Sequence, residues 1–173
     1  MGDLVYNQVS VCLTEKAELV RKIIVVFANG FGLGLSPFAP GTVGSLLGVA
    51  IVVGIGFAHI NWMWQAGIAA VLAICAIPIC EVGELHYKTK DDHRIVADEY
   101  LTFPLCMIGI PWMAHPWFLA VAFVVNRVMD IIKPPPARQI QNLHGGLGIA
   151  LDDIFSSLYA LGVNYLIFKL IVR

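Results

Sequence analysis

The chain has 173 residues, which is enough for a single domain with its own core, and we treat residues 1–173 as one domain. Hydrophobic residues make up 58% of the chain and charged residues only 13%, well below the roughly 25% typical of soluble chains. The net charge of -1 offers no basic surface for nucleic acid, so the composition excludes that partner and favours a protein embedded in a lipid bilayer.

Residues 1–29 are predicted to form an amphipathic, cytoplasmic segment. Within it, residues 14–28 (TEKAELVRKIIVVFA) begin polar and end apolar, as expected for a helix that lies on a membrane surface. A plain helix packed against the rest of the chain fits the same pattern.

Five apolar stretches follow the N-terminal segment. Each approaches the ~20 residues that a helix needs to cross the hydrocarbon core. The first two are apolar throughout, whereas the last three are polar at one end. The stretches are 43–60, 62–80, 95–113, 117–132 and 149–168. We therefore expect an all-α, polytopic membrane bundle of roughly four or five embedded helices, together with the N-terminal surface helix.

The connecting segments differ in charge. Residues 81–94 and 133–148 contain lysine and arginine, as does the N-terminal segment, whereas residues 59–65 and 114–117 contain neither. By the positive-inside rule, the N-terminus and the two basic loops face the cytoplasm. Lys169 and Arg173 then lie on the opposite side, which counts against a full crossing by 149–168.

After His93 the acidic residues all lie in apolar stretches, namely Asp98, Glu99, Asp130, Asp152 and Asp153. The predicted topology brings them to the same depth and the same membrane face. Carboxylates so close together raise one another's pKa, so protonation, basic partners or a metal ion must compensate them. A set of ligands made of oxygen atoms alone suits Mg²⁺, which also retains water and binds substrate phosphate.

Basic and hydroxyl residues lie beside these acids. Arg127, Asp130 and Lys133 share one side of a helix that the following prolines end, so Lys133 and Arg138 are placed at its mouth, where they can meet a phosphate group. In the glycine-rich turn 30–48, Thr42 and Ser45 either bind an anion at a helix N-terminus or only cap that helix.

Plainer interpretations stay open for several of these residues. Asp152 and Asp153 also suit a surface position near a helix N-terminus, where the helix dipole favours negative charge. Arg127, Asp130 and Lys133 also suit a structural ladder of ion pairs along a helix. His93 and His144 fit exposed loop positions, with one of them as a proton donor as the alternative.

Four segments, SPFAPGTVGSL, RIVADE, NRVMDIIKPPPAR and HGGLGIALDDI, resemble the motifs of the phosphatidylglycerophosphatase A family in order and approximate spacing, over residues 30–160. The resemblance implies a Mg²⁺-dependent phosphatase of the bacterial inner membrane that converts phosphatidylglycerophosphate, a lipid held in the bilayer, to phosphatidylglycerol. It assigns Asp98 and Glu99 to the family's DE pair, Asp130 and Lys133 to its D-x-x-K-P segment, Asp152 and Asp153 to the aspartates after its GG turn, and Thr42 and Ser45 to its PGT-x-GS motif.

The chain departs from the family pattern at positions that carry no charge. Ala97 stands where an aromatic residue usually precedes DE, and Asn126 stands where phenylalanine often precedes the arginine. Pro135 replaces a tryptophan, and Ser156 and Ser157 replace an alanine and a glycine. These changes bear on substrate fit more than on chemistry.

The sequence lacks a Cys-x5-Arg phosphatase loop, a D-x-D-x-T/V aspartyl-phosphate motif and the K-x6-RP lipid phosphatase signature. That leaves attack on phosphorus by water or by an aspartate with the help of a metal ion. We expect the five acids to bind Mg²⁺ and, with Lys133, to form the catalytic group. Thr42, Ser45, Lys133 and Arg127 or Arg138 are expected to bind the phosphate. The rival is a small transporter that uses the acids for ion or proton coupling, which predicts acids spread across the membrane depth. The oligomeric state stays open.

Overall fold

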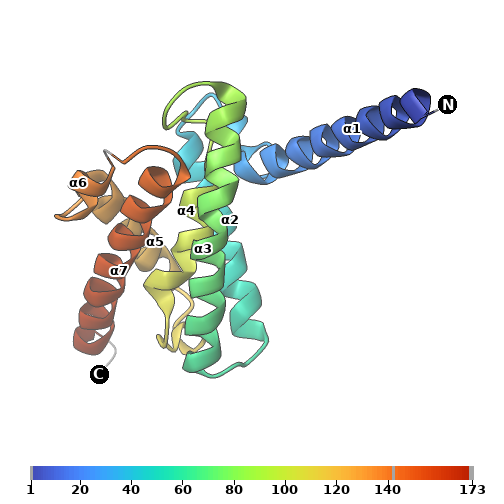
Figure 1. Ribbon diagram of the computed structural model, residues 1–173. Helices are drawn as coiled ribbons and strands as arrows, with labels where there is room; N and C mark the ends of the chain where they lie inside the picture. The colour runs from blue at the N-terminus through green and yellow to red at the C-terminus, as the bar shows by residue number, and fades with distance from the viewer. Residues whose placement is uncertain (1, 142, 172–173) are drawn as a thin grey trace.

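The computed structural model describes residues 2–141 and 143–171, and within this range every regular element is a helix (Figure 1). Side chains are described from residue 15 onward, so the first half of the predicted amphipathic segment lies outside the described side chains. In chain order the elements are α1 (Gly2–Ala28), η1 (Leu33–Leu35), α2 (Pro40–Phe57), α3 (Trp62–Tyr87), α4 (Ala97–Thr102), η2 (Phe103–Met107), η3 (Trp112–Ala114), α5 (Phe118–Ile132), α6 (Ala137–Ile140) and α7 (Gly146–Ile171).

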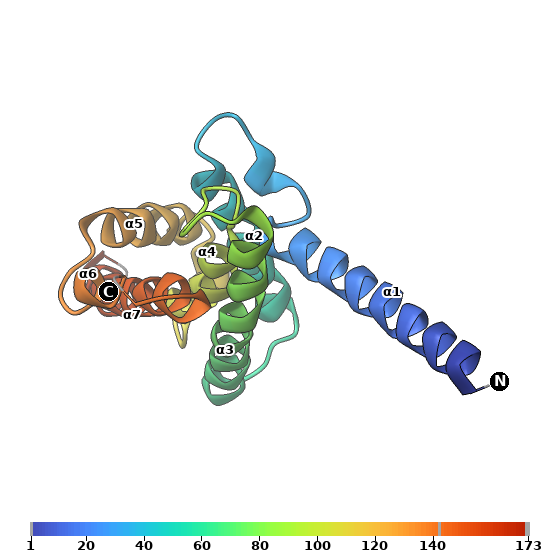
Figure 2. The same cartoon turned by 45° about the horizontal axis from the view of Figure 1, so that its top comes forward.

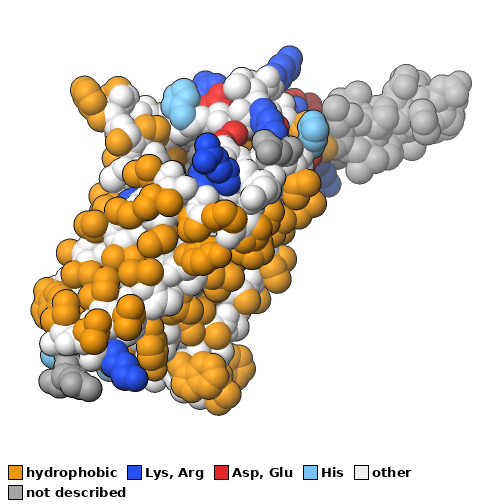
Figure 3. Space-filling model, turned by 90° about the vertical axis from the view of Figure 1, so that its left-hand side faces the viewer, with side chains coloured by type: hydrophobic (Ala, Val, Ile, Leu, Met, Phe, Trp, Pro, Cys, Tyr) orange, Lys and Arg blue, Asp and Glu red, His pale blue; other side chains and the backbone are white. Residues whose placement is uncertain are grey.

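Three of these helices, α2, α3 and α7, are long and apolar enough to cross a membrane. Only 22 to 28% of the residues in each apolar window are buried inside the protein, so most of their side chains are at least partly exposed at its surface. Figure 3 shows the hydrophobic side chains covering the flank of the molecule, while charged side chains gather at its upper end. The stretch 149–168 lies within α7. It is therefore part of a candidate span, although the positions of Lys169 and Arg173 counted against a full crossing.

The predicted number of four or five spans is not confirmed, because the third and fourth stretches form shorter elements. Residues 95–113 divide into α4, η2 and η3, and Pro104, which lacks a backbone N–H, lies in the first turn of η2. Residues 117–132 form α5, whose 15 residues extend about 22 Å, less than the ~30 Å of a hydrocarbon core.

The short elements α4 and η2 fill the centre of the bundle. They contact α2, α3 and α7, and nearly all of their residues are buried. Glycines of α2 permit this close packing: a Cβ atom on Gly44 would lie 2.6 Å from Val96 Cβ, and one on Gly48 would lie 2.5 Å from Phe103 Cβ. The glycines therefore fix how closely α4 approaches α2.

The helix α1 is longer than the predicted 14–28 and extends away from the bundle, across the direction of α3 (Figures 1 and 2). Its last turn is anchored, because Ala28 O accepts a hydrogen bond from Val96 N at 2.9 Å and Phe27 O accepts one from Tyr100 Oη at 2.9 Å. Leu19, Val20 and Ile23 are exposed, so α1 carries apolar surface outside the bundle. Its place on a membrane surface stays a prediction.

Candidate active site

A cavity of about 450 Å³ lies where the starts of α2 and α7 meet the α3–α4 loop, α4 and the end of α5. Its walls contain all the carboxylates that the sequence analysis singled out, together with Arg127 and Lys133. These carboxylates are Asp98, Glu99, Asp130, Asp152 and Asp153. Acids from three distant parts of the chain therefore share one open space.

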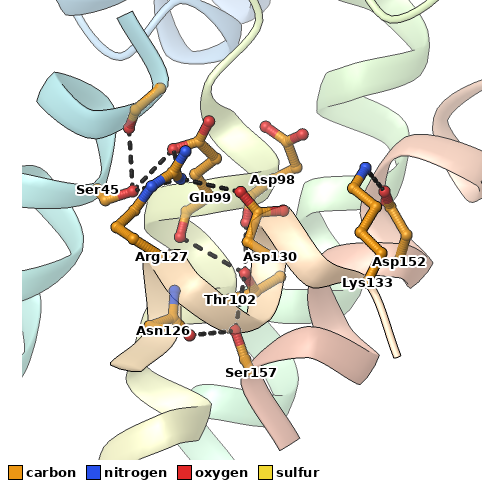
Figure 4. Close-up of polar contacts among 11 residues, drawn as sticks. Ser45, Asp98, Glu99, Thr102, Asn126, Arg127, Asp130, Lys133, Asp152 and Ser157 are labelled. Atoms are coloured by element: carbon orange, nitrogen blue, oxygen red, sulfur yellow. Dashed lines mark hydrogen bonds and ion pairs between the residues drawn. The ribbon is translucent and has the colours of Figure 1, made fainter. Parts of the chain in front are cut away.

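The carboxylate of Glu99 has two partners (Figure 4). Ser45 Oγ donates a hydrogen bond to Glu99 Oε2 at 2.7 Å, and Arg127 Nη1 donates one at 2.6 Å. The contact requires glycine on α2, because a Cβ atom on Gly41 would lie 1.9 Å from Glu99 Oε1. The PGT-x-GS motif thus places a hydroxyl under Glu99 and leaves room for its carboxylate.

Arg127 joins two of the acids. Its Nη1 lies 2.6 Å from Glu99 Oε2 and 3.1 Å from Asp130 Oδ2, and it also donates to Ser45 Oγ at 3.2 Å. Arg127 and Asp130 form the first step of the helix ladder that the sequence spacing allows. The guanidinium is therefore held by carboxylates from α4 and α5.

Lys133 does not continue this ladder of ion pairs along α5. It ends α5 in the left-handed conformation, with φ of 47°, and its Nζ donates a hydrogen bond to Asp152 Oδ2 on α7 (Figure 4). Partial burial lowers the pKa of Lys133, but the hydrogen bond and the charge of Asp152 outweigh burial, and the net direction is upward. Lys133 is therefore a positively charged partner of the aspartates after the GG turn.

The start of α7 is fixed by a carboxylate of α3. Gly146 N donates a hydrogen bond to Glu81 Oε2. A Cβ atom on Gly145 would lie 2.2 Å from this oxygen, and one on Gly146 would lie 2.1 Å from Ile77 O. The GG turn therefore lets α7 begin directly against α3, and this contact sets the position of Asp152 and Asp153 one to two turns later.

The α3–α4 loop forms another wall of the cavity and is held by an ion pair. Arg94 Nε and Nη2 donate to the two oxygens of Asp92, each at 2.8 Å. These hydrogen bonds lower the pKa of Asp92 to about 2, although its burial acts in the opposite direction. Asp92 stays ionised at physiological pH, and the loop presents Asp91 and His93 to the cavity.

The oxygen atoms of the cavity leave room for a cation. The buried Oδ1 atoms of Asp98 and Asp152 have no hydrogen-bond partner, which is costly for a carboxylate unless something else compensates it. Within the described part of the chain, no three His, Cys, Asp or Glu side chains are arranged to hold an ion together. The two unpartnered oxygens could supply only part of a coordination shell, so a metal ion here would need water and substrate as further ligands, as Mg²⁺ commonly does.

The remaining predicted residues differ in their position relative to the carboxylate cavity. Thr42 lines the cavity, and Ser45 lies beneath Glu99. Arg138 lies outside the cavity wall, in a neighbouring cavity. His93 lies at the exposed rim, and His144 is an exposed loop residue.

Sequence reasoning missed Asp91 because it belongs to a polar loop, where acids are ordinarily solvated. Asp91 has a φ of 51°. It lines both the carboxylate cavity and the neighbouring cavity that contains Arg138. Only its closeness in sequence to the RIVADE segment pointed to it.

The sequence profile of the phosphatidylglycerophosphatase A family matches residues 26–168. The chain belongs to the phosphatidylglycerophosphatase A family. The phosphatidylglycerophosphatase A of Escherichia coli K12 is 34% identical over 145 residues, which cover 82% of this chain and 81% of the relative. That of Haemophilus influenzae is 32% identical over 157 residues, or 88% of this chain and 93% of the relative.

A third relative bears a different substrate in its name. This Bacteroides thetaiotaomicron protein, provisionally named a phosphatidylinositol-3-phosphatase, is 32% identical over 143 residues, which cover 79% of this chain and 87% of the relative. No solved structure matches the chain.

Two departures from the phosphatidylglycerophosphatase A pattern contact each other. Ser157 Oγ donates a hydrogen bond to Asn126 Oδ1 at 3.1 Å, and both residues are buried beneath the acids (Figure 4). This hydrogen bond gives the core beneath the acids a polar contact between α5 and α7.

Proposed function

We propose that this protein hydrolyses the terminal phosphate of phosphatidylglycerophosphate to give phosphatidylglycerol and phosphate. Its membership in the phosphatidylglycerophosphatase A family supports this activity. The observation that carries the proposal is the meeting of five carboxylates with Arg127 and Lys133 in one cavity at the end of three candidate spans.

Mg²⁺ is the cofactor that we propose for this site. Asp98 and Asp152, each with an unpartnered buried oxygen, would supply its first protein ligands, and Glu99, Asp130 and Asp153 add negative charge to the same cavity. When bound, Mg²⁺ neutralises phosphate charge and favours attack on phosphorus. Because no three of these groups form a ready-made cage, the ion would keep several waters and bind substrate oxygens, as Mg²⁺ commonly does.

The positive groups of the cavity have separate parts in the proposed reaction. Lys133 and Arg127 lie among the acids and offset the negative charge that builds on the phosphate oxygens. Thr42 and Gly41 form the first turn of α2, whose free backbone N–H groups and dipole favour an anion at this wall. Glu99 and Asp130 hold the Arg127 guanidinium in a fixed orientation, so little reorganisation is needed when substrate binds.

The proposed location is the bacterial inner membrane, with the cavity open to the cytoplasm. Lys90, Lys133 and Arg138, from the basic segments between α3 and α4 and between α5 and α7, line the two cavities. By the positive-inside rule, this end of the molecule faces the cytoplasm. The transporter alternative is not favoured, because the acids gather at one end rather than along a path through the bundle.

The proposal is tested by phosphate release from purified protein in detergent micelles. Wild-type protein is expected to release phosphate from phosphatidylglycerophosphate with Mg²⁺ and to stop when EDTA removes the ion. Asp152→Asn is expected to lose at least about 1,000-fold in rate, because it removes an oxygen ligand and the partner of Lys133. Phosphatidylinositol 3-phosphate belongs in the same assay, since one relative is provisionally named for it.

Glu18→Gln is the control, since Glu18 lies on the exposed part of α1, away from the cavity, where it pairs with Lys22. It should keep the wild-type rate. Equal rates for wild type and Asp152→Asn, or full activity in EDTA, would rule out the proposed role of the acids.

A further inference from the structure

A second cavity of about 400 Å³ adjoins the carboxylate cavity. It is lined by Lys90, Asp91, Arg138 and Gln141, and Asp91 lines both cavities. The elements around it are the α3–α4 loop and the short helix α6. None of its residues takes part in the reaction proposed above.

The two cavities differ in charge. The carboxylate cavity contains Asp91 and the five predicted acids against two cations, Arg127 and Lys133. The second cavity contains two cations, Lys90 and Arg138, against Asp91. A second anionic group of a ligand would therefore be repelled by the first cavity and attracted by the second.

The proposed substrate has two phosphate groups of different kinds. One is the terminal phosphomonoester that is removed, and the other is the phosphodiester that joins the head group to the acylated glycerol. A phosphodiester keeps one negative charge and needs a partner when it leaves water. An arginine can bind it through two parallel N–H···O bonds, and a lysine can add a point charge.

We propose that the Lys90–Arg138 cavity binds the phosphodiester of the lipid substrate while the terminal phosphate occupies the carboxylate cavity. This inference rests on the proposed function and adds the group that selects the substrate. Asp91, at the boundary, is placed to accept a hydrogen bond from the hydroxyl of the glycerol between the two phosphates. The two cavities thus recognise a lipid that carries a phosphomonoester beyond a phosphodiester.

Steady-state kinetics of Arg138→Gln in neutral detergent, with no other charged lipid present, test the inference. The KM for phosphatidylglycerophosphate is expected to rise about tenfold while kcat stays within about twofold, because one charge-assisted contact to an unreacting group is lost. Inhibition by phosphatidylglycerol, which keeps only the phosphodiester, should weaken by the same factor. Inhibition by inorganic phosphate, which resembles only the terminal group, should not change.

Two matched variants serve as controls. Lys88→Gln removes a positive charge from the same loop at a residue that lines neither cavity, and it should leave KM unchanged. Arg138→Lys keeps the charge but not the paired N–H donors, and it should recover part of the affinity for phosphatidylglycerol. Equal weakening of both inhibitors, or unchanged inhibition by phosphatidylglycerol in Arg138→Gln, would overturn the inference, as would an effect that arises only when a separate anionic lipid is added.

Binding of short-chain phosphatidylglycerol, measured by calorimetry, separates this inference from the proposed function because it needs no turnover. Tighter binding to wild type than to Arg138→Gln, without phosphate release by either protein, would remove the proposed function and leave the binding site standing. Normal phosphate release by both proteins, with equal binding of phosphatidylglycerol, would leave the proposed function standing and remove the binding site.

Discussion

At the scale of single residues, Lys133 and Asp152 form the contact that joins the end of α5 to α7. Both side chains are largely shielded from water, with exposed fractions of 22% and 5%. Removing one charge from such a pair leaves the other without compensation, which commonly costs about 2–5 kcal/mol. Because the pKa of Lys133 is raised, its contribution to stability is complete below the ordinary lysine pKa of about 10.4 and is lost only as the pH rises through the raised value.

Lys133→Met is therefore expected to lower phosphate release at least about 100-fold and to lower the melting temperature in detergent. Lys133→Arg should keep stability better than activity, since the planar guanidinium presents its charge differently. The matched control is Lys169→Met in the last turn of α7, far from the cavity, which should change neither quantity. A Lys133→Met protein with wild-type turnover would contradict the assignment.

The buried pair Asn126 and Ser157 permits a second prediction at this scale. Asn126→Phe and Ser157→Gly should each destabilise the protein by about 1–3 kcal/mol, the first by overpacking and the second by leaving a buried amide oxygen unpaired. The double variant restores the family pattern and should cost less than the sum of the two single changes. Thermal unfolding of the four proteins in detergent measures this coupling, and strictly additive effects would show that the two residues are independent.

Charge pattern was enough to predict which acids meet. The positive-inside rule assigned the basic loops to the cytoplasmic side, so the acids at the neighbouring ends of the apolar stretches were expected at the same membrane face. The cavity contains all five of them. The pattern did not reveal that Arg138 lines a separate cavity or that Asp91 lines both, because short loops carry no periodicity from which a direction can be read.

At the scale of secondary structure, the contact between α3 and the start of α7 decides where Asp152 and Asp153 lie. Glu81 accepts the hydrogen bond of Gly146 N, and the two glycines leave no room for side chains. A displacement of about 1 Å in a catalytic group can cost about 100-fold in rate. The glycine turn therefore acts on the site from a distance of one to two helical turns.

Gly146→Ala is expected to lower stability by about 1–3 kcal/mol and activity by about 10- to 100-fold, because a Cβ atom there would lie 2.1 Å from Ile77 O. Gly162→Ala, in the same helix with nothing within 4 Å of its Cβ position, should leave activity unchanged and stability equal or higher. Melting temperature and phosphate release distinguish the two. Equal behaviour of the two variants would show that the GG turn does not position α7.

The helices were predicted with uneven success. α2, α3 and α7 follow directly from long apolar runs, and α5 follows from 117–132. The stretch 95–113 was wrong as one helix, because its hydrophobicity reflects burial inside the bundle rather than contact with lipid. A buried segment and a lipid-facing one have the same composition, and in this stretch only Pro104, Gly109 and Pro111 signalled the breaks.

At the scale of the whole molecule, the charged end and the apolar flank define how the protein would sit in a bilayer (Figure 3). The α2–α3 turn lies at the end opposite to the cavity, because both helices run between the two ends of the bundle (Figure 1). This orientation is tested directly by labelling each end of the protein with a reagent that reaches only one side of the membrane.

In a background without the four native cysteines, Ala58→Cys and Thr89→Cys place one thiol in each connecting segment. A membrane-impermeant maleimide should label the Ala58→Cys protein in spheroplasts, whereas the Thr89→Cys protein should react only after the inner membrane is disrupted. The reverse pattern would turn the cavity toward the periplasm and remove the cytoplasmic assignment.

The cavity opens at the end of helices whose outer faces are apolar over most of their length. For the proposed reaction, this arrangement puts the two products into different phases as soon as they separate. Inorganic phosphate diffuses into the aqueous phase, whereas the acylated alcohol never has to leave the lipid. The proposed reaction therefore needs neither a tunnel nor a moving gate to keep the two exit routes apart.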